Sequence, residues 1–434
     1  MNPAARISAV VSFIPANMAV VVLPTTAVIL GDSLIYIVLP LSIVEFGITE
    51  TWGLSTAFWV GLALSINRFI RLATNSLAAQ TYHHFGLRWP LVSATALGAL
   101  TTLSYGFTKG AIALIIARAL WGLAYSHLRL AAHLTALDIA DNRARGKLFG
   151  IFNSGQRAGS FAAVTAGAFL ANAYDRDVTF TVLAAIGVIG VLIATRAPML
   201  TPTVPIANAD TTPTSGGGIW RILVGASDDV SLHLRRLMLS ISFLRFSTAF
   251  AANGLVIATV TPYIEEILEG DATLFGAGVN VVTLAGILVG VRWFSNLALA
   301  VPFGHVADVF GRRRTIAVGI TLMLASLAMA GLSPNLELVV LSLPVLFLSG
   351  ALLETTLDAA MGESTPQKSR PAGMARYGTW LDLGAAIGPI LGFVIGERFG
   401  FSTGYWIAVI VVGLAVTLYL RESRSGARLK DVSS

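Results

Sequence analysis

Runs of about 20 apolar residues recur along nearly the whole chain, and they constrain its fold more than any other feature. A helix of that length crosses the roughly 30 Å hydrocarbon core of a bilayer. Of the 434 residues, 55% are hydrophobic and only 12% are charged, whereas soluble domains carry about 25% charged residues. The chain is therefore predicted to be an all-α membrane protein.

Twelve spans are predicted from the apolar runs and the turn residues between them. The first six are expected at 17–42, 54–78, 90–107, 111–135, 148–171 and 178–195, and the last six at 238–262, 278–302, 315–332, 338–359, 377–396 and 402–420. The stretch between them is rich in Pro, Thr, Ser and Gly, which is typical of a linker. The predicted organisation is an N-terminal six-helix bundle (1–196), a central linker (197–236), a C-terminal six-helix bundle (237–421) and a tail (422–434).

The distribution of Lys and Arg predicts the orientation, since cytoplasmic loops carry an excess of both. With both termini inside, the cytoplasmic segments hold 19 Lys and Arg, the outside loops hold three, and seven lie within spans. We therefore predict a multi-pass protein of the cell (inner) membrane, with termini, linker and tail in the cytoplasm. The net charge of +6 then reflects topology, and no nucleic-acid partner is expected.

An ungapped shift of 225 residues aligns the second predicted span and its following loop with the eighth span and its loop. The alignment gives seven identities in 28 positions, and the Phe-Gly-x-Arg of residues 85–88 falls on that of residues 310–313. Two apolar helices can match this well by chance. The shared motif at the same helix exit favours duplication of a six-helix unit.

The loop after the eighth span carries a specific motif. Residues 304–314 read Gly-His-Val-Ala-Asp-Val-Phe-Gly-Arg-Arg-Arg, which resembles the G-x-x-x-D-x-x-G-R-[RK] signature of the major facilitator superfamily of transporters. Glycine allows a tight turn and close helix approach, and the acidic residue lies near a helix end, where it can meet a neighbouring helix N-terminus or the Arg cluster. The resemblance implies two pseudo-symmetric six-helix bundles and a gating loop formed by Gly304, Asp308, Gly311, Arg312 and Arg313.

The first-half copy of this loop departs from the signature, because Ala79 replaces the first Gly and His83 replaces the Asp. A gate in the first half is therefore in doubt. Two shorter motifs resemble the proton-coupled drug and metabolite efflux group of the family. Residues 118–122 read R-x-x-x-G, and residues 384–392 read G-x-x-x-G-P-x-x-G. The second motif marks the fifth helix of exporters but stands here in the eleventh span, where it is equally well explained as a small-residue packing seam.

Ionisable residues inside the spans point to function, since each costs about 2.5–3.5 kcal/mol at a helix centre. They must face a cavity, pair with each other or reach an interface. The resemblance implies that the first, fourth, seventh and tenth helices line a central cavity, and each of them carries such residues. The proton-coupling candidates are Asp32, Arg118 and Glu354, and the substrate-cavity candidates are Tyr36, Tyr125, Arg157, Arg245 and Asn253. In contrast, Arg71, Arg129 and Asp358 are expected near span ends, where a structural role is favoured.

These residues support a hypothesis of proton-coupled alternating access, in which Asp32 takes and releases a proton and Arg118 modulates it. A purely structural Asp32–Arg118 pair is the alternative. We expect export of a drug-like or siderophore-like metabolite; uptake of an organic anion and a non-transporting receptor or assembly factor remain open. No catalytic constellation, metal site or cofactor is expected. The expected partners are a small-molecule substrate, protons and the lipid bilayer, and the expected state is a monomer.

Overall fold

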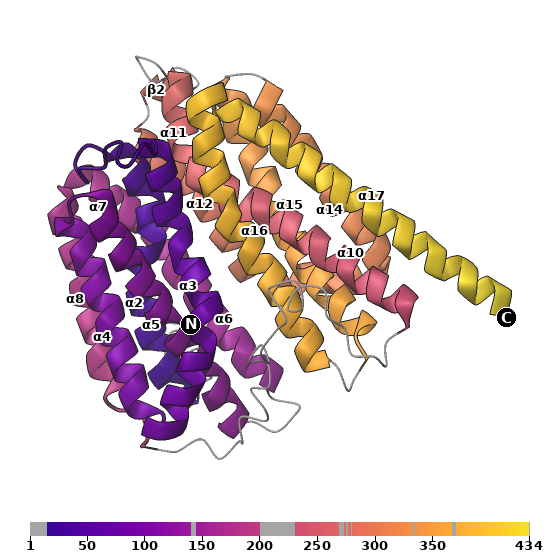
Figure 1. Cartoon of the computed structure of the whole chain (residues 1–434), viewed down its shortest axis with the longest axis horizontal. Coiled ribbons are helices and arrows are strands. Elements are labelled where there is room, and N and C mark those ends of the chain that lie inside the picture. The colour runs from indigo at the N-terminus through magenta and orange to yellow at the C-terminus, as the bar shows by residue number, and fades with distance from the viewer. Residues whose placement is uncertain are drawn as a thin grey trace, which may run out of the picture. The chain divides into compact units, whose positions relative to one another are not determined.

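The computed structural model of the chain is almost entirely helical (Figure 1). It describes residues 15–139, 145–199, 231–268, 273–274, 277–278, 280–332, 335–366 and 370–433. The chain divides into two compact units, which we call unit 1 (Met1–Val38 with Ile70–Thr212) and unit 2 (Leu39–Phe69 with Pro213–Ser434). Each unit is described by itself below.

Unit 1 is a bundle of helices in which α4 packs against both α8 and α5, as Figure 1 shows. Helices α2 and α3 contribute to both units, because their residues fall on either side of the division. The elements of this part are α2 (Ala16–Leu41), α3 (Thr56–Phe85), α4 (Arg88–Phe107), α5 (Ala111–Ile139), α6 (Arg145–Ala162), the π-helix η1 (Ala163–Gly167), α7 (Ala168–Ala173) and α8 (Arg176–Ala194).

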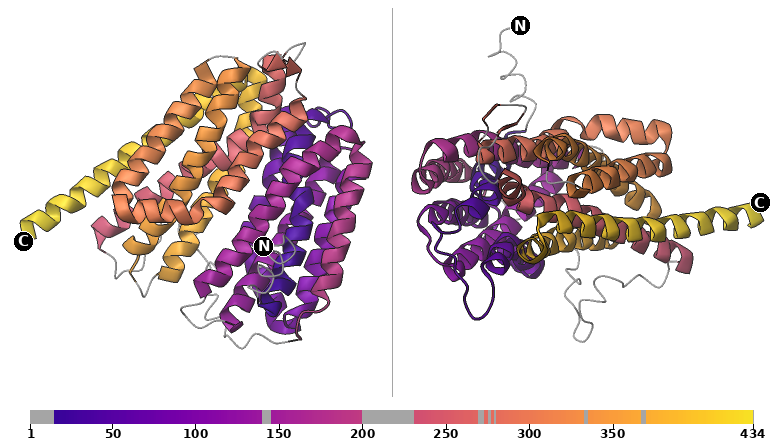
Figure 2. Two further views of the ribbon diagram at one scale, coloured as in Figure 1. Left: turned by 180° about the vertical axis from the view of Figure 1, so that it is seen from behind. Right: turned by 90° about the horizontal axis from the view of Figure 1, so that it is seen from above.

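Unit 2 is also a helical bundle, with α14 packed against α15 and α17, and α16 packed against a π-helical turn, η2. Its α17 continues as one long helix, which both views of Figure 2 show. The elements are α10 (Leu232–Thr248), η2 (Ala249–Leu255), α11 (Val256–Leu268), β1 (Thr273–Leu274), β2 (Ala277–Gly278), α12 (Val281–Ala298), α13 (Ala300–Phe310), α14 (Arg312–Leu332), α15 (Leu336–Ser364), α16 (Arg370–Phe399) and α17 (Phe401–Ser433).

The predicted spans fall on these helices. Among the described residues, nine helices are long and apolar enough to cross a membrane. The spans predicted at 54–78, 90–107 and 148–171 correspond to α3, α4 and the run α6–η1–α7, so the number of twelve stays a prediction. Most of the linker predicted at 197–236 lies outside the described residues, and the domain boundaries also stay predictions.

Several boundaries were predicted too short. The second span was expected to end at residue 78 and the tenth at 359, but α3 continues to Phe85 and α15 to Ser364. The tail expected from residue 422 continues the helix α17. Polar and charged residues stop an apolar run in the sequence, whereas the helical hydrogen bonds continue past them into the loop region.

The duplicated Phe-Gly-x-Arg has a structural reason. Gly86 and Gly311 both adopt a positive φ, 68° and 84° respectively. Each glycine stands between two helices, the first between α3 and α4 and the second between α13 and α14. Residues with a side chain larger than hydrogen disfavour a positive φ, so the backbone at both places favours glycine.

The glycines of residues 384–392 form a packing seam between α16 and the end of α10 with η2. A Cβ atom added at Gly388 would lie 2.5 Å from Leu255 N and 2.6 Å from Gly254 Cα, and one at Gly384 would lie 2.3 Å from Phe246 O. The two backbones therefore touch, as at small-residue interfaces of membrane helices. The packing alternative for this motif is the one that the structure supports.

We predict that Gly388→Ala destabilises the protein by about 1–3 kcal/mol, because the added methyl group overlaps backbone atoms that cannot move aside. Gly378→Ala is the matched control on the same helix, since a Cβ there meets nothing within 4 Å. Thermal unfolding in detergent, followed by intrinsic fluorescence, should show a lower midpoint temperature for Gly388→Ala than for the unsubstituted protein. Gly378→Ala should leave the midpoint unchanged. Equal midpoints would contradict the seam.

Candidate functional site

The centre of unit 1 is an ion pair between α2 and α5. Nη1 of Arg118 donates to Oδ1 of Asp32, and the Arg118 side chain is fully buried while that of Asp32 is 17% exposed. The guanidinium also lies 5.4 Å from the ring centre of Tyr36 and 5.9 Å from that of Tyr105. The structure thus brings together three predicted residues, and it adds Tyr105 of α4, which the sequence analysis missed.

The other unit 1 candidates lie further along α5 and on α6. Tyr125 donates to Oε1 of Gln156 at 3.1 Å, and the guanidinium of Arg71 lies 5.0 Å from the Tyr125 ring centre. Arg129 donates to Oδ1 of Asn75 at 3.4 Å. Arg157 is half-buried on α6. The two arginines that were expected to reach an interface therefore have partners between α3 and α5, a ring of α5 for Arg71 and an amide of α3 for Arg129.

Unit 2 contains a second buried arginine, which forms ion pairs with two carboxylates. Nη2 of Arg245 lies 3.4 Å from Oε1 of Glu354, and its Nε lies 3.8 Å from Oδ1 of Asp358. Tyr377 of α16 donates to Oδ1 of Asp358 at 2.7 Å. Arg245 is only 2% exposed. Two predicted residues, Arg245 and Glu354, are brought together here.

The expectation that Asp358 stands near the end of its span was wrong, because α15 runs six residues further, to Ser364. Asp358 is one turn along α15 from Glu354, so both carboxylates lie on one face. That spacing was the signal available in the sequence. No comparable signal existed for Tyr377, since an uncharged aromatic residue in an apolar span is ordinary.

Asn253 lies in η2, and its backbone carbonyl accepts a hydrogen bond from Nη2 of Arg68 at 3.4 Å. π-Helical turns are frequent at functional sites. Their altered ladder also leaves a carbonyl available to side chains. The described contact of Asn253 is therefore made by its backbone, whereas the sequence analysis considered its side chain.

The signature loop forms an ion-pair network between α13, α14 and α15. Nη2 of Arg312 lies 2.5 Å from Oδ1 of Asp308 and 3.0 Å from Oε1 of Glu363. Gly311 makes the turn between the helices, Arg313 is exposed and Gly304 is half-buried. The predicted contact between the Asp and the Arg cluster is present, and Glu363 is an additional partner.

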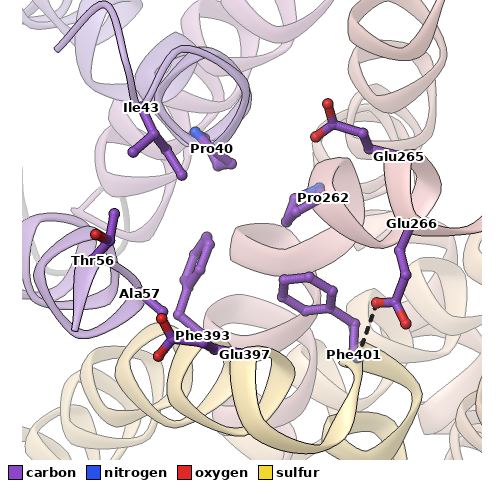
Figure 3. A pocket seen from close by; sticks show the side chains of 10 residues that line it. All are labelled: Pro40, Ile43, Thr56, Ala57, Pro262, Glu265, Glu266, Phe393, Glu397 and Phe401. Carbon is purple, nitrogen blue, oxygen red and sulfur yellow. Dashed lines mark hydrogen bonds between the residues drawn. The ribbon is translucent and has the colours of Figure 1, made fainter. Parts of the chain in front are cut away.

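A cavity of about 390 Å³ in unit 2 lies away from these clusters. Figure 3 shows Glu265 and Glu397 on different sides of it, with Phe393 and Phe401 between them. The third carboxylate, Glu266, accepts a hydrogen bond from the backbone N–H of Phe401 at 3.2 Å. None of the predicted site residues lines this cavity, so its size alone does not make it the functional site.

In each ion-pair cluster, a carboxylate can replace its arginine partner by a proton or by a charged ligand. In a low-dielectric surrounding such an exchange has a large energetic effect, so it can bias one helix arrangement over another. Neither cluster presents a nucleophile next to a base. The arrangement fits charge-linked movement of helices.

The family model described as Major Facilitator Superfamily matches residues 21–280 and 241–433. The chain belongs to the major facilitator superfamily. Solved structures with this fold include a bacterial homologue of the human lysosomal transporter Spinster (TM-score 0.68, 15% identity, covering 94% of this chain and 96% of that one). The nucleoside transporter NupG is similar too (TM-score 0.68, 14% identity, 95% and 99% covered).

Curated relatives within the superfamily include transporters named for drug resistance. Multidrug resistance protein MdtG of Rahnella sp. is 24% identical over 381 residues, which are 88% of this chain and 87% of that protein. The inner membrane transport protein YajR of Escherichia coli is 27% identical over 139 residues, 32% of this chain and 30% of YajR. The lincomycin resistance protein of Streptomyces lincolnensis is 36% identical, but the match spans only 26% of its length.

We predict that Asp32→Asn and Arg118→Met each destabilise this superfamily member by about 3–5 kcal/mol, because each leaves an uncompensated buried group. The double variant should lose less than the sum, since it removes both charges. Denaturant titration in mixed micelles measures all three. The exposed pair gives the control: Glu363→Gln should cost about 0–1 kcal/mol. Strictly additive losses would contradict the coupling of Asp32 to Arg118.

Proposed function

We propose that the chain is a proton-coupled exporter of drug-like or metabolite-like amphiphiles that works by alternating access. The observation that carries this proposal is the buried pair of Asp32 and Arg118. A carboxylate kept next to a buried arginine can bind a proton only when the pair opens. Protonation and the movement of α2 relative to α5 are thereby linked.

The position of each cluster along its helices supports alternating access. Asp32 stands nine residues before the end of α2, and Arg118 stands seven residues after the start of α5. In unit 2, Glu354 stands ten residues before the end of α15. Each pair thus lies in the interior of its helices, where opening the pair can accompany a rearrangement of those helices.

Export rather than uptake is favoured by the relatives whose names give a direction. The MdtG proteins are named for multidrug resistance, and LfrA of Mycolicibacterium smegmatis is named a multidrug efflux pump, with 29% identity over 39% of this chain. An amphiphilic substrate also fits sites that combine aromatic rings with charged groups, as around Arg118 and Tyr125. Uptake of an organic anion is an outcome that the following test can return.

The test is accumulation of fluorescent amphiphiles and of organic anions in inverted membrane vesicles under an imposed pH gradient, acidic inside. We expect the amphiphiles to accumulate and a protonophore to abolish the accumulation. Accumulation of the anions in right-side-out vesicles instead would establish uptake. No gradient-dependent accumulation of either class would contradict transport coupled to protons.

We predict that Asp32→Asn lowers gradient-driven accumulation by about 5- to 150-fold, the range of coupling free energies of about 1–3 kcal/mol, while substrate binding persists. Glu354→Gln tests the carboxylate of unit 2 in the same way. Glu337→Gln is the control, since that carboxylate is exposed at the start of α15. Full-rate transport by Asp32→Asn with unchanged dependence on the pH gradient would contradict the proton-coupling role of Asp32.

A further inference from the structure

A buried histidine of unit 1 is not used by the ion-pair clusters. His127 of α5 is 9% exposed, and its ring reaches α3. Its Nδ1 lies 3.0 Å from the backbone carbonyl oxygen of Leu123, and its Nε2 lies 3.1 Å from the hydroxyl oxygen of Thr81. Both ring nitrogens are therefore engaged by oxygen atoms.

The roles of these oxygens determine where the ring carries hydrogen. A carbonyl oxygen can only accept, so Nδ1 of His127 must donate to Leu123. The Thr81 hydroxyl has a single hydrogen, and it donates that hydrogen to the carbonyl of Leu77 at 2.6 Å. With the hydrogen on Leu77, the hydroxyl can only accept from Nε2, so Nε2 must donate as well; with the hydrogen turned to Nε2, the ring is neutral and the hydrogen bond to Leu77 is lost. Both contacts of Thr81 are hydrogen bonds at once only in the first arrangement. A ring that donates from both nitrogens is an imidazolium.

We propose that His127 is a proton-binding site of unit 1, and that its bound proton fastens α5 to α3. When the proton leaves, Nε2 becomes an acceptor, and the Thr81 hydroxyl must turn away from Leu77 to satisfy it. The contact between the helices then changes from a charged hydrogen bond to a neutral one, which is about half as strong. Histidine is the side chain whose ordinary titration falls between pH 5 and 8.

Other contacts between α3 and α5 lie near His127 and depend on the charge of its ring. The hydroxyl of Tyr82 donates to the backbone carbonyl of His127 at 2.9 Å, and the Tyr82 ring centre lies 6.0 Å from the imidazole. An aromatic ring at that distance attracts a cation more than a neutral ring. Further along, Thr74 and Ser126 share a hydrogen bond of 2.8 Å. Loss of the proton therefore weakens two contacts of α3 at one place.

Other charges do not reach the imidazole in the contacts described. Among the described residues, the titratable side chain that contacts the His127 ring is Tyr82. Besides Tyr82, the charged and titratable side chains described on α5 and the helices around it are Arg118, Tyr125, Arg129, His133 and Asp138 on α5, Arg68, Arg71, His83 and His84 on α3, Arg88 and Tyr105 on α4, Lys147 and Arg157 on α6, and Asp32 and Tyr36 on α2. Of these, Arg129 is held by Asn75, and His83 and His84 are exposed and contact each other.

The place of this histidine explains the degraded signature of the first half. The Asp308–Arg312–Glu363 network of unit 2 joins two carboxylates to one guanidinium. In the corresponding segment of α3, Ala79 and His83 stand in place of the glycine and the acid. The His127 contact at Thr81 lies between these two positions. Unit 1 thus joins its helices here by an imidazole–hydroxyl contact where unit 2 uses carboxylate–guanidinium ion pairs.

The direct test is side-chain ¹⁵N NMR of the full chain in lipid nanodiscs, with histidine labelled and His127→Gln used for assignment. We expect both ring nitrogens of His127 to be protonated at pH 7, and Thr81→Val to give a neutral ring at the same pH, because its valine cannot accept from Nε2. His84→Gln is the matched control and should leave the His127 signal unchanged. A neutral His127 ring at pH 7 in the unsubstituted protein would overturn the proposal.

A second readout separates proton binding from a structural role, and it rests on the proposed transport function. Transport into vesicles at pH 6 and pH 8 gives a ratio of rates, which we expect His127→Gln and Thr81→Val to change by about fivefold or more, the lower end of the usual coupling range. His84→Gln should keep the ratio. Unchanged ratios in both variants overturn the link to transport. Because the NMR measurement needs no substrate, its result stands even if transport itself fails.

Discussion

A guanidinium group in a membrane-spanning helix must find its partners inside the protein, because hydrocarbon offers none. Most of the intramembrane arginines show such a partner, and the partners differ in kind. They are carboxylates for Arg118 and Arg245, aromatic rings for Arg71 and Arg292, an amide side chain for Arg129 and a π-helical carbonyl for Arg68. The packing of each unit is arranged around meeting this requirement.

The same requirement connects stability with transport. A buried ion pair adds little net stability, but opening it is costly. A helix pair joined in this way has few intermediate arrangements, which suits the alternation between two states that we propose for this protein. The glycine seam of α16 serves the opposite purpose, since direct backbone contact at Gly384 and Gly388 leaves no room for sliding. Unit 2 thus combines a rigid seam with a polar cluster that can rearrange.

Much of the candidate site was predictable from the free-energy cost of placing charged side chains in membrane-spanning helices. Asp32, Arg118, Arg245 and Glu354 stand out in apolar runs, and the structure pairs them as neighbours across helices. Asp358 was misjudged because the sequence placed the end of α15 too early. Tyr105, Tyr377 and His127 were missed because aromatic and polar side chains are common in helix interiors, and only their contacts distinguish them.

The sequence by itself determined the class of fold, the positions of the spans and the duplicated turn. These depend on composition averaged over about 20 residues and on glycine at a positive φ, and both can be read locally. Only the tertiary structure decided which charges meet. Arg118 and Asp32 are 86 residues apart, and their contact depends on the rotation and depth of two helices. Spacing along a chain determines neighbours on one helix face, but not the partner that a second helix presents.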